Sequence, residues 1–245
     1  MVNDRSEQHQ TAIVTGAGKR VGADIARTLI AAGWRVVAHV HHDGDAVPEG
    51  AVKVVADLAE PDCGARIIAA AGDSPTLLVN NAARFAEDGF GSFSVAEFDR
   101  HMAVNVRAPV LLIEAFARIA PRGALVVNLL DAKLAAPNPD FLSYTLSKQA
   151  LAGLTELAAR GLAGQGIRVN AIAPALMLPS GKQGEANFAA VHRLNPLGLG
   201  VEPGDVVRAL FYLVEAATMT GQTLTIDGGQ RFLGLPRDVQ YLETK

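Results

Sequence analysis

The chain has little of what several protein classes require. Cysteine occurs once among the 245 residues, as Cys63, and aromatic residues make up 5%. A single cysteine forms no disulfide within the chain and gives no paired thiolates for a zinc site, so we expect a reducing, cytoplasmic setting. The longest apolar run, around 171–178, falls far short of the roughly 20 residues of a membrane-spanning helix. The first ten residues are polar and include acids, unlike a signal peptide.

Neither sign of charge dominates the sequence. There are 22 Lys and Arg residues against 25 Asp and Glu residues, which gives a formal net charge of -3. No long acidic or basic block is present, so the chain lacks the electrostatic footprint of a protein that binds nucleic acid or an anionic membrane. We therefore expect a small molecule as the partner, and neither nucleic acid nor membrane.

What the sequence does contain is a regular alternation of two patterns. Short runs rich in Val and Ile, apolar on both faces, are typical of buried parallel strands, and the longer segments between them have apolar residues at helical spacing. The expected strands are 12–15, 35–40, 52–56, 77–80, 124–130, 168–172 and 223–226. The expected helices are 22–32, 62–71, 95–119, 142–163 and 203–215.

This alternation predicts an α/β fold, because repeated strand-helix units usually form a right-handed parallel sheet. We expect a single-domain Rossmann fold with a doubly wound parallel sheet of about seven strands and helices on both faces. No linker or shift in composition divides residues 1–245. Within this domain we expect a polar N-terminal tail at 1–10 and a long irregular stretch at 173–202, interpreted as a substrate loop.

A glycine-rich segment, Thr15-Gly-Ala-Gly-Lys-Arg-Val-Gly22, follows the first expected strand and opens the first expected helix. At such a place glycines let the backbone approach a pyrophosphate, whose charge is favoured by free amides and by the positive end of the helix. The alternative is a tight turn that binds nothing. The residues expected to bind a dinucleotide here are Gly16, Gly18, Lys19, Arg20, Val21 and Gly22.

The end of the second expected strand indicates which dinucleotide is preferred. Dinucleotide folds carry an acidic residue there for the ribose diol of NAD, or basic residues for the 2′-phosphate of NADP. Here Val40 occupies the acidic position, and His41 and His42 follow it, so together with Lys19 they favour NADPH. Asp43 opposes this preference, since a carboxylate repels a phosphate.

The same strand end raises the alternative of a metal site, because His39 and His41 face one side of the strand. No further ligand pattern lies nearby in the sequence, so we expect no metal.

Tyr144 and Lys148 lie four residues apart in the expected helix 142–163, so their side chains meet on one face. An unperturbed phenol has a pKa near 10. An adjacent ammonium favours the phenolate and brings the tyrosine closer to the range in which it gives or takes a proton. The alternative is a purely structural pair, and the place of this helix in a dinucleotide-binding array favours the catalytic interpretation.

These motifs resemble the signatures of the short-chain dehydrogenase/reductases and occur in family order from Thr15 to Gly229. The glycine segment resembles T-G-x-x-x-G-x-G with Arg20 in place of the middle glycine, and Tyr144 with Lys148 resembles Tyr-x-x-x-Lys. The other matching segments are Asn80-Asn-Ala-Ala83, Val104-Asn-Val106, Asn170 with Pro174 but with Ala175 in place of the family's glycine, and Asp227-Gly-Gly229. The resemblance implies an oxidoreductase that assembles as a homotetramer, partly through the segments 95–119 and 142–163.

The resemblance also implies roles for individual residues. Asn105 would support a proton relay, and Lys148 would hold the ribose hydroxyls of the cofactor and lower the pKa of Tyr144. Asp57 would bind the adenine amino group, cap the helix expected to start near Pro61, or do both. Further cofactor contacts are implied for Leu58, Asn81, Ala82, Ala83, Tyr144, Lys148, Pro174 and Met177.

The residue thirteen positions before Tyr144 indicates which class of substrate fits the site. Most short-chain reductases place a serine there to hold a substrate carbonyl oxygen, whereas this chain has Asp131. A carboxylate repels a developing alkoxide, so the site suits a substrate with N–H donors or with a ring nitrogen that takes a proton.

Asp131, Arg20 and Phe85 together resemble the pteridine reductases and dihydromonapterin reductases. The resemblance implies that Phe85 stacks a pterin ring, and that Arg20 pairs with phosphate or with the polar edge of the heterocycle. The alternatives are a core phenylalanine and a solvent-facing arginine.

The sequence therefore predicts an NADPH-dependent oxidoreductase of the pteridine-reductase type, which transfers hydride to a C=N bond of a dihydropterin-like or dihydrofolate-like heterocycle. Its expected catalytic residues are Tyr144, Lys148, Asp131 and Asn105, and its expected substrate-binding residues are Arg20, Phe85, Asp131 and Tyr144. Two alternatives are a generic NADP-dependent carbonyl or alcohol oxidoreductase and a non-catalytic NADP-binding protein. The tail at 231–245 either packs on a neighbouring subunit or frames the pocket.

Overall fold

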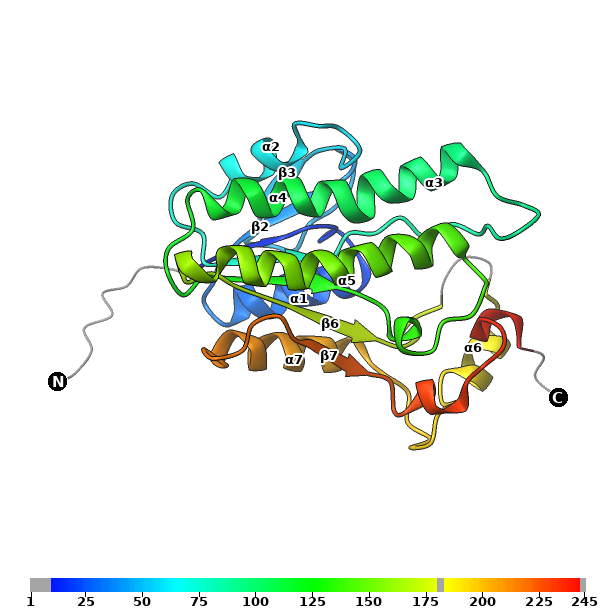
Figure 1. Ribbon diagram of the computed structural model, residues 1–245. Helices are drawn as coiled ribbons and strands as arrows, with labels where there is room; N and C mark the ends of the chain where they lie inside the picture. The colour runs from blue at the N-terminus through cyan, green and yellow to red at the C-terminus, as the bar shows by residue number, and fades with distance from the viewer. Residues whose placement is uncertain (1–9, 180–182, 243–245) are drawn as a thin grey trace.

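The computed structural model describes residues 10–179 and 183–242. The centre of this described part is a sheet of seven parallel strands in the order β3-β2-β1-β4-β5-β6-β7 (Figure 1). The strands are β1 (Thr11–Val14), β2 (Arg35–Val40), β3 (Val52–Val55), β4 (Leu77–Asn80), β5 (Leu125–Leu129), β6 (Arg168–Pro174) and β7 (Thr223–Ile226). The order reverses between β1 and β4, at the kind of switch point where doubly wound sheets bind ligands. The predicted fold class is confirmed.

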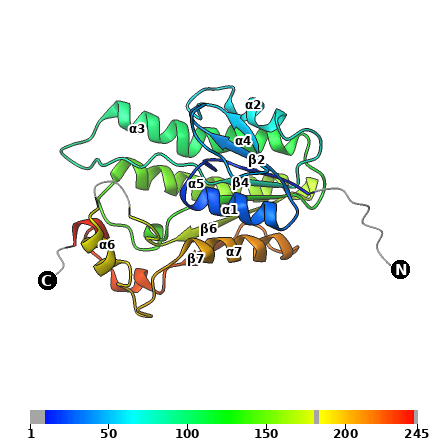
Figure 2. The ribbon, with the colours of Figure 1, turned by 180° about the vertical axis from the view of Figure 1, so that it is seen from behind.

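Helices cover both faces of the sheet. The α-helices are α1 (Arg20–Ala31), α2 (Cys63–Ala69), α3 (Val95–Met102), α4 (Ala108–Ala117), α5 (Leu142–Leu162), α6 (Glu185–Val191) and α7 (Pro203–Glu215). The shorter helical turns are η1 (Ala103–Arg107), η2 (Ala132–Ala135), η3 (Ala163–Gln165), η4 (Gln230–Leu233) and η5 (Val239–Tyr241). α1 and α7 pack on one face, and α2, α4 and α5 pack on the other (Figures 1 and 2).

The strands are buried on both faces, as their continuous apolar runs predicted. In β1, Val14 packs with the layer of α1 and α7, whereas Ile13 packs with the layer of α2, α4 and α5. Burying one such side chain contributes about 1.5–3 kcal/mol. The sheet therefore holds two apolar layers together, and the chemistry-bearing residues lie beyond its carboxyl ends.

The segment expected as one helix at 95–119 is divided by a π-helical turn, η1. Pro109 has no N–H to donate to the carbonyl of Asn105, so the regular helical ladder cannot cross this point. The N–H of Ala108 instead bonds to the carbonyl of Ala103, five residues back, and widens the helix there. Asn105, a predicted site residue, lies in this turn.

The stretch expected to be irregular at 173–202 contains α6. This helix has 7 residues, too few for helical periodicity to stand out among the neighbouring glycines and prolines. Residues 180–182 of the expected substrate loop and residues 1–9 of the expected N-terminal tail lie outside the described residues.

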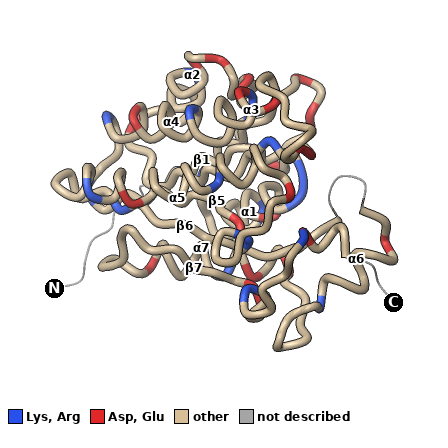
Figure 3. The backbone as a smooth tube through the Cα atoms, turned by 45° about the vertical axis from the view of Figure 1, so that its right-hand side comes forward, with Lys and Arg blue, Asp and Glu red and all other residues tan. Residues whose placement is uncertain are grey.

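The carboxyl edge of the sheet is covered from outside by chain that is distant in sequence. η5 packs beside α6, and η4 packs beside η2 (Figure 1). Figure 3 shows basic and acidic residues scattered over the helices and loops, with neither sign gathered over one layer. Of the helices described, none combines the length and the apolar character that spanning a membrane would require.

Candidate active site

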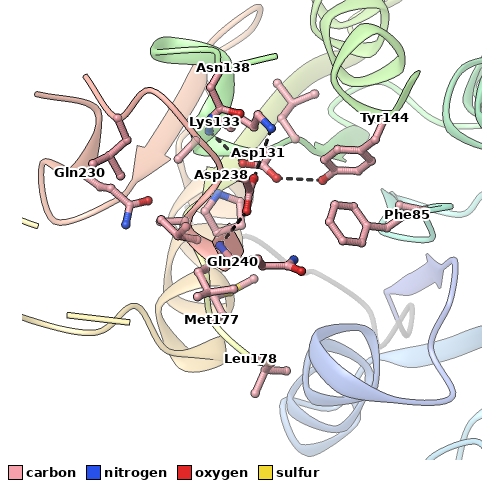
Figure 4. A pocket seen from close by; sticks show the side chains of 18 of the residues that line it. Phe85, Asp131, Lys133, Asn138, Tyr144, Met177, Leu178, Gln230, Asp238 and Gln240 are labelled. Atoms are coloured by element: carbon pink, nitrogen blue, oxygen red, sulfur yellow. Dashed lines mark hydrogen bonds and ion pairs between the residues drawn. The ribbon is translucent and has the colours of Figure 1, made fainter. Parts of the chain in front are cut away.

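A cavity of about 520 Å³ opens at the carboxyl edge of the sheet (Figure 4). Its wall comes from the loop before α1, the segments that follow β4, β5 and β6, the first turn of α5, and the C-terminal residues. The predicted site residues that line it are Lys19, Arg20, Val21, Ala83, Phe85, Asp131, Tyr144, Pro174 and Met177. The structure thus brings the expected proton donor, carboxylate, aromatic ring and glycine loop to one place.

Tyr144 and Asp131 form a hydrogen-bonded pair inside this cavity. The Tyr144 hydroxyl donates to Asp131 Oδ2 at 2.9 Å, and the backbone N–H of Lys133 donates to Asp131 Oδ1 at 2.8 Å. Burial raises the pKa of the Asp131 carboxyl, although these two hydrogen bonds and the Lys148 ammonium oppose the rise. Asp131 therefore keeps its proton to a higher pH than a free aspartate.

Burial also acts on Tyr144. It raises the pKa of the phenol well above its usual range, and the charge and hydrogen bond of Asp131 raise it further. We expected Lys148 to lower this pKa, but in this structure burial and the neighbouring carboxylate raise it. Tyr144 is therefore a neutral hydroxyl that donates a hydrogen bond.

Lys148 lies behind the cavity lining. Its ammonium Nζ donates to the carbonyl of Leu129 at 2.6 Å and lies 5.7 Å from the centre of the Tyr144 ring. Burial lowers the pKa of Lys148 to about 8, and the nearby Asp131 carboxylate opposes this shift. The ammonium is thus anchored at the end of β5, one helical turn after Tyr144.

Asn105 also lies behind the lining and is 1% exposed. Its side-chain oxygen accepts the Arg84 N–H at 2.7 Å, and its amide nitrogen donates to the Arg84 carbonyl and to Ser147 Oγ, both at 2.9 Å. These bonds join the segment after β4 to α5. Among the described residues its partners are therefore Arg84 and Ser147 rather than Tyr144 or Lys148, and its part in a relay stays a prediction.

Phe85 is a wall residue and not a core residue, because 36% of it is exposed. Its ring stacks on Phe141 at a centroid distance of 4.4 Å and meets the Tyr144 ring edge-on at 4.7 Å. Phe141 precedes α5 with φ +54°, a strained conformation for a residue other than glycine. Tyr241 stacks on the same Phe141 at 5.7 Å. Sequence analysis did not identify Phe141 and Tyr241 as supporting rings.

The glycine loop has the form that an anionic ligand requires. Gly16 has φ +65°, and a Cβ on Gly22 would lie 2.2 Å from the Gly16 carbonyl oxygen, so neither position tolerates a side chain. At the start of α1, Lys19 occupies the N-cap position without a side-chain hydrogen bond, and the first turn has no acidic residue. The first amides of α1 are therefore open to a phosphate group, which fits a bound dinucleotide.

Asn81 and Thr15 fasten this loop to β4. Asn81 Nδ2 donates to the carbonyls of Thr15 and Gly16 at 2.8 and 3.2 Å, and Thr15 Oγ1 accepts the backbone N–H groups of Asn81 and Ala82, both at 3.0 Å. Asn81 and Ala82, two of the residues expected at the cofactor, thus help to hold the glycine loop. Leu58, another expected contact, is buried in the core.

His39 has a role that sequence analysis missed. It is 2% exposed, its Nδ1 accepts the Gly16 N–H at 3.2 Å, and its Nε2 pairs with the Ala56 carbonyl at 3.0 Å. Burial lowers the pKa of His39, which keeps the ring neutral. Both ring nitrogens pair with backbone groups, those of Gly16 and Ala56, and are not available to a metal ion in this arrangement. His39 therefore supports the glycine loop.

Arg20 ties the start of α1 to the expected substrate loop. Its guanidinium donates to the carbonyls of Pro179 and Leu178 at 2.8 and 3.4 Å. The residue is exposed and lines the cavity, but its partners are backbone oxygens. The backbone of Arg20 has φ +54°, the region that glycine adopts without strain.

The expected 2′-phosphate site lies at the exposed end of β2. The rings of His41 and His42 stack at 3.9 Å, and His41 Nε2 lies 3.7 Å from Asp57 Oδ2. Asp57 also accepts the Ala59 N–H at 2.8 Å. α2 begins only at Cys63, so the alternative that Asp57 caps this helix is wrong.

Comparison with known protein families decides the assignment. The family model described as enoyl-(acyl carrier protein) reductase matches residues 16–231, which is most of the chain. The chain belongs to the short-chain dehydrogenase/reductase family. It is accordingly an oxidoreductase, as its motifs predicted.

Among curated members of this short-chain dehydrogenase/reductase family, L-xylulose reductase from Homo sapiens is 33% identical over 233 residues, covering 89% of this chain and 94% of that protein. A 3beta-hydroxysteroid dehydrogenase 1 from Eggerthella lenta is 32% identical over 243 residues, covering 90% of this chain and 93% of that protein. These sequence relatives are named for the reduction or oxidation of sugars and steroids.

Two similar solved structures are named for a different reaction, the reduction of dihydrofolate. FolM alternative dihydrofolate reductase 1 from Brucella suis, in complex with NADP, superposes with a TM-score of 0.83 at 35% identity and covers 91% of this chain and 95% of that one. The protein of the same name from Brucella canis, complexed with NADP, gives 0.82 at 34% identity, covering 91% and 94%. Both complexes agree with the predicted preference for NADP.

This short-chain dehydrogenase/reductase has a C-terminal segment, residues 235–242, beyond the part that the family model matches. Arg237 Nε donates to Asp140 at 2.8 Å, and the Tyr241 hydroxyl donates to Glu87 at 2.6 Å. Leu235 and Asp238 of this segment line the cavity. The described part of the tail, up to residue 242, thus frames the pocket of its own chain. Residues 243–245 lie outside the described residues, and packing of the tail on a neighbouring subunit stays a prediction.

Proposed function

We propose that this protein is an NADPH-dependent reductase that acts on a C=N bond of a flat nitrogen heterocycle of the dihydropterin or dihydrofolate type. The observation that carries the proposal is the 2.9 Å hydrogen bond from the Tyr144 hydroxyl to Asp131, at the position where the resemblance to short-chain reductases implies a serine that holds a carbonyl oxygen. A carboxyl group there opposes alkoxide formation but can hold the proton that a ring nitrogen needs.

The proton balance explains why two groups are needed. When bound, NADPH supplies a hydride to the carbon of the C=N bond. The Tyr144 hydroxyl gives a proton to the nitrogen, and the carboxylic acid form of Asp131 returns a proton to the tyrosine oxygen. Asp131 is then left as a carboxylate that can accept a hydrogen bond from the Tyr144 hydroxyl, and the two oxygens lie 2.9 Å apart in the structure. Solvent protonates Asp131 before the next turnover.

The remaining cavity residues support a planar substrate and a phosphorylated cofactor. Phe85 offers one exposed ring face beside Tyr144, which suits stacking with a heterocycle. The open amides of α1 and the basic side chains Lys19, His41 and His42 suit the phosphates of NADPH. The NADP complexes of the FolM structures support the same cofactor.

A second candidate is a carbonyl reductase, because L-xylulose reductases are 33% identical to this chain. In that case Asp131 would stand in for the serine and would have to be protonated to stabilise the substrate oxygen. The alternative of a non-catalytic NADP-binding protein is disfavoured by the family assignment and by the pairing of Tyr144 with Asp131.

The decisive experiment assays the purified protein with NADPH against 7,8-dihydropterins, dihydrofolate, L-xylulose and simple ketones, beside the variant Asp131→Ser. We expect dihydropterin turnover in the wild type and a loss of about 100-fold or more in the variant, with NADPH binding unchanged. Turnover of ketones or sugars alone, undiminished by Asp131→Ser, would support the carbonyl reductase. NADPH binding without turnover of any compound would support the non-catalytic protein.

We further propose that the chain, 1–245, acts as one domain within a homotetramer in the cytoplasm. The exposed apolar residues of α4 and α5 support assembly, with Val110, Leu146 and Leu157 exposed by 43%, 41% and 70%. The single buried Cys63 fits a reducing compartment.

A further inference from the structure

The C-terminal segment brings a second carboxylate to the cavity that holds the reacting pair. Asp238 lines the cavity, and its side chain is 15% exposed (Figure 4). The family model ends at residue 231, so this carboxylate is a feature of this chain outside the matched region. Nothing in the proposed reaction uses it directly.

Lys133 links this carboxylate to Asp131. Its ammonium, on a side chain that is 9% exposed, donates to Asp238 Oδ2 at 3.2 Å and to the carbonyl of Asp140 at 2.6 Å. Its backbone N–H donates to Asp131 Oδ1 at 2.8 Å. One residue therefore holds the C-terminal segment by its side chain and orients the Asp131 carboxyl by its main chain.

Hydrogen bonds hold the C-terminal segment, residues 235–242, beside Lys133. The Asp238 N–H donates to Asp140 Oδ2 at 2.7 Å, and Arg237 pairs with the same carboxylate at 2.8 Å. Asp238 Oδ1 accepts the Gln240 N–H at 3.2 Å. These contacts keep the Asp238 carboxylate in the wall, where its charge reaches the pair.

We propose that Asp238 is a positioning residue that acts through Lys133 on Asp131 and keeps that carboxyl in its acid form for proton delivery. The role rests on the function proposed above. Asp238 contacts neither Tyr144 nor the substrate in this scheme. It neutralises the Lys133 ammonium, which would otherwise stabilise the Asp131 anion, and it adds its own negative charge.

The charged groups around Asp131 come from four parts of the chain. They are Lys148 on α5 beside the neutral Tyr144 hydroxyl, Lys133 on η2 paired with Asp238, Arg237 paired with Asp140 and Arg231 paired with Asp227 near the C-terminus, and Lys19 and Arg20 in the glycine loop. The negative charge of Asp238 raises the pKa values of both Asp131 and Tyr144. Removing that charge therefore shifts both members of the pair in one direction.

The test measures the titration of Asp131 without cofactor or substrate. Protein labelled with carbon-13 at the aspartate side-chain carboxyl is titrated by NMR, and the Asp131 signal is assigned by its loss in Asp131→Asn. In Asp238→Asn, which keeps the shape and an acceptor oxygen, we expect the pKa of Asp131 to fall by about half a unit or more. In Lys133→Met, the Asp238 carboxylate loses its cationic partner, and we expect the pKa of Asp131 to rise.

Tyr241→Phe provides the matched control on the same segment, because it loses the bond to Glu87 but keeps the ring on Phe141. We expect no shift there. Equal titrations in Asp238→Asn and the wild type, or shifts of one sign in all three variants, would overturn the proposal. The pH profile of kcat/KM with a dihydropterin provides the second readout, and its alkaline limb should move to lower pH in Asp238→Asn. If no dihydropterin is turned over while the NMR shifts occur, the proposed function fails and the effect of Asp238 on Asp131 stands.

Discussion

At the scale of single residues, the buried Tyr144–Asp131 pair governs how the protein responds to pH. Two titratable groups joined by one hydrogen bond in a buried site titrate as a unit, so their apparent pKa values belong to the pair. Burial raises the pKa of Asp131, and the first proton to leave is therefore lost at higher pH than from a free carboxyl.

This pair gives a prediction for the pH dependence of the reaction. With a dihydropterin and NADPH, kcat/KM should fall as pH rises through the apparent pKa of the pair, because deprotonation removes the acid form of Asp131. Stopped-flow or steady-state rates between pH 4 and 9 measure it. Asp131→Asn, which cannot titrate, should be slow and should lack this limb. A wild-type rate that climbs with pH over the same interval would contradict the proton donor assigned here.

The burial of Lys148 gives a prediction for stability. Its pKa of about 8 in the fold lies below the usual lysine value of 10.5, so the charged form is less stable in the protein than in the unfolded chain. This cost is fully present below pH 8 and disappears as pH rises through 10.5, since between these values the unfolded chain binds more protons. Removing the ammonium should therefore stabilise the fold at neutral pH.

We expect Lys148→Met, without cofactor, to raise the free energy of unfolding at pH 7 by about 2 kcal/mol, after allowance for the lost bond to the Leu129 carbonyl. Urea denaturation monitored by circular dichroism measures it. The gain should shrink toward pH 10, and Lys148→Arg, which keeps the charge, should show no gain. Activity should be lost in Lys148→Met. Lys148 would then lower the stability of the fold while being required for activity.

At the scale of elements, the glycine loop between β1 and α1 depends on a neighbour from β2. The loop presents the open amides of α1, and the His39 ring accepts the Gly16 N–H underneath it. A loop held by a buried hydrogen bond loses less freedom when it binds a phosphate group, so the affinity for NADPH depends on this histidine.

Replacing His39 with Leu should weaken NADPH binding about tenfold, since a buried N–H loses its acceptor at a cost of about 1–2 kcal/mol. Calorimetry with NADPH measures the dissociation constant. His39→Gln, which keeps a side-chain acceptor, should retain most of the affinity. The turnover number at saturating NADPH should change little in either variant, because the Tyr144–Asp131 pair lies across the cavity. An unaltered dissociation constant in His39→Leu would rule out this supporting role.

Most strands could be predicted from the sequence, whereas one helix and one π-helical turn were not predicted. The strands were predictable because each is apolar on both faces, and Tyr144, Asp131 and Phe85 were predictable because family motifs fix their spacing. Helix α6 was not predicted because its 7 residues are too few to show helical periodicity. The π-helical turn at Asn105 was signalled by Pro109, which sequence analysis did not use.

The contacts that were missed join residues far apart in the chain. Lys133 and Asp238 are 105 positions apart, and the stack of Phe85 on Phe141 depends on a left-handed residue before α5. No local pattern encodes such contacts, because they arise from packing of the finished fold. The neutral state of His39 likewise follows from burial under the glycine loop.

At the scale of the whole molecule, one face of α5 has no packing partner among residues 10–179 and 183–242. Leu146, Ala150, Gly153 and Leu157 follow one another at helical spacing along it, and Leu157 is 70% exposed. An apolar stripe with a small residue at its centre allows a second helix to approach closely. This surface lies on the side of the sheet away from α1 and α7.

Leu157→Glu should therefore dissociate the assembly into smaller species, because a carboxylate buried against its own copy is both desolvated and repelled. Size-exclusion chromatography with light scattering gives the mass of each species. Arg27→Gln provides the control, since it changes the net charge by the same amount on α1, at the opposite face of the sheet. A wild-type chain that runs as a monomer at micromolar concentration would contradict the proposed assembly. An unchanged assembly in Leu157→Glu would place the interface on another surface of the molecule.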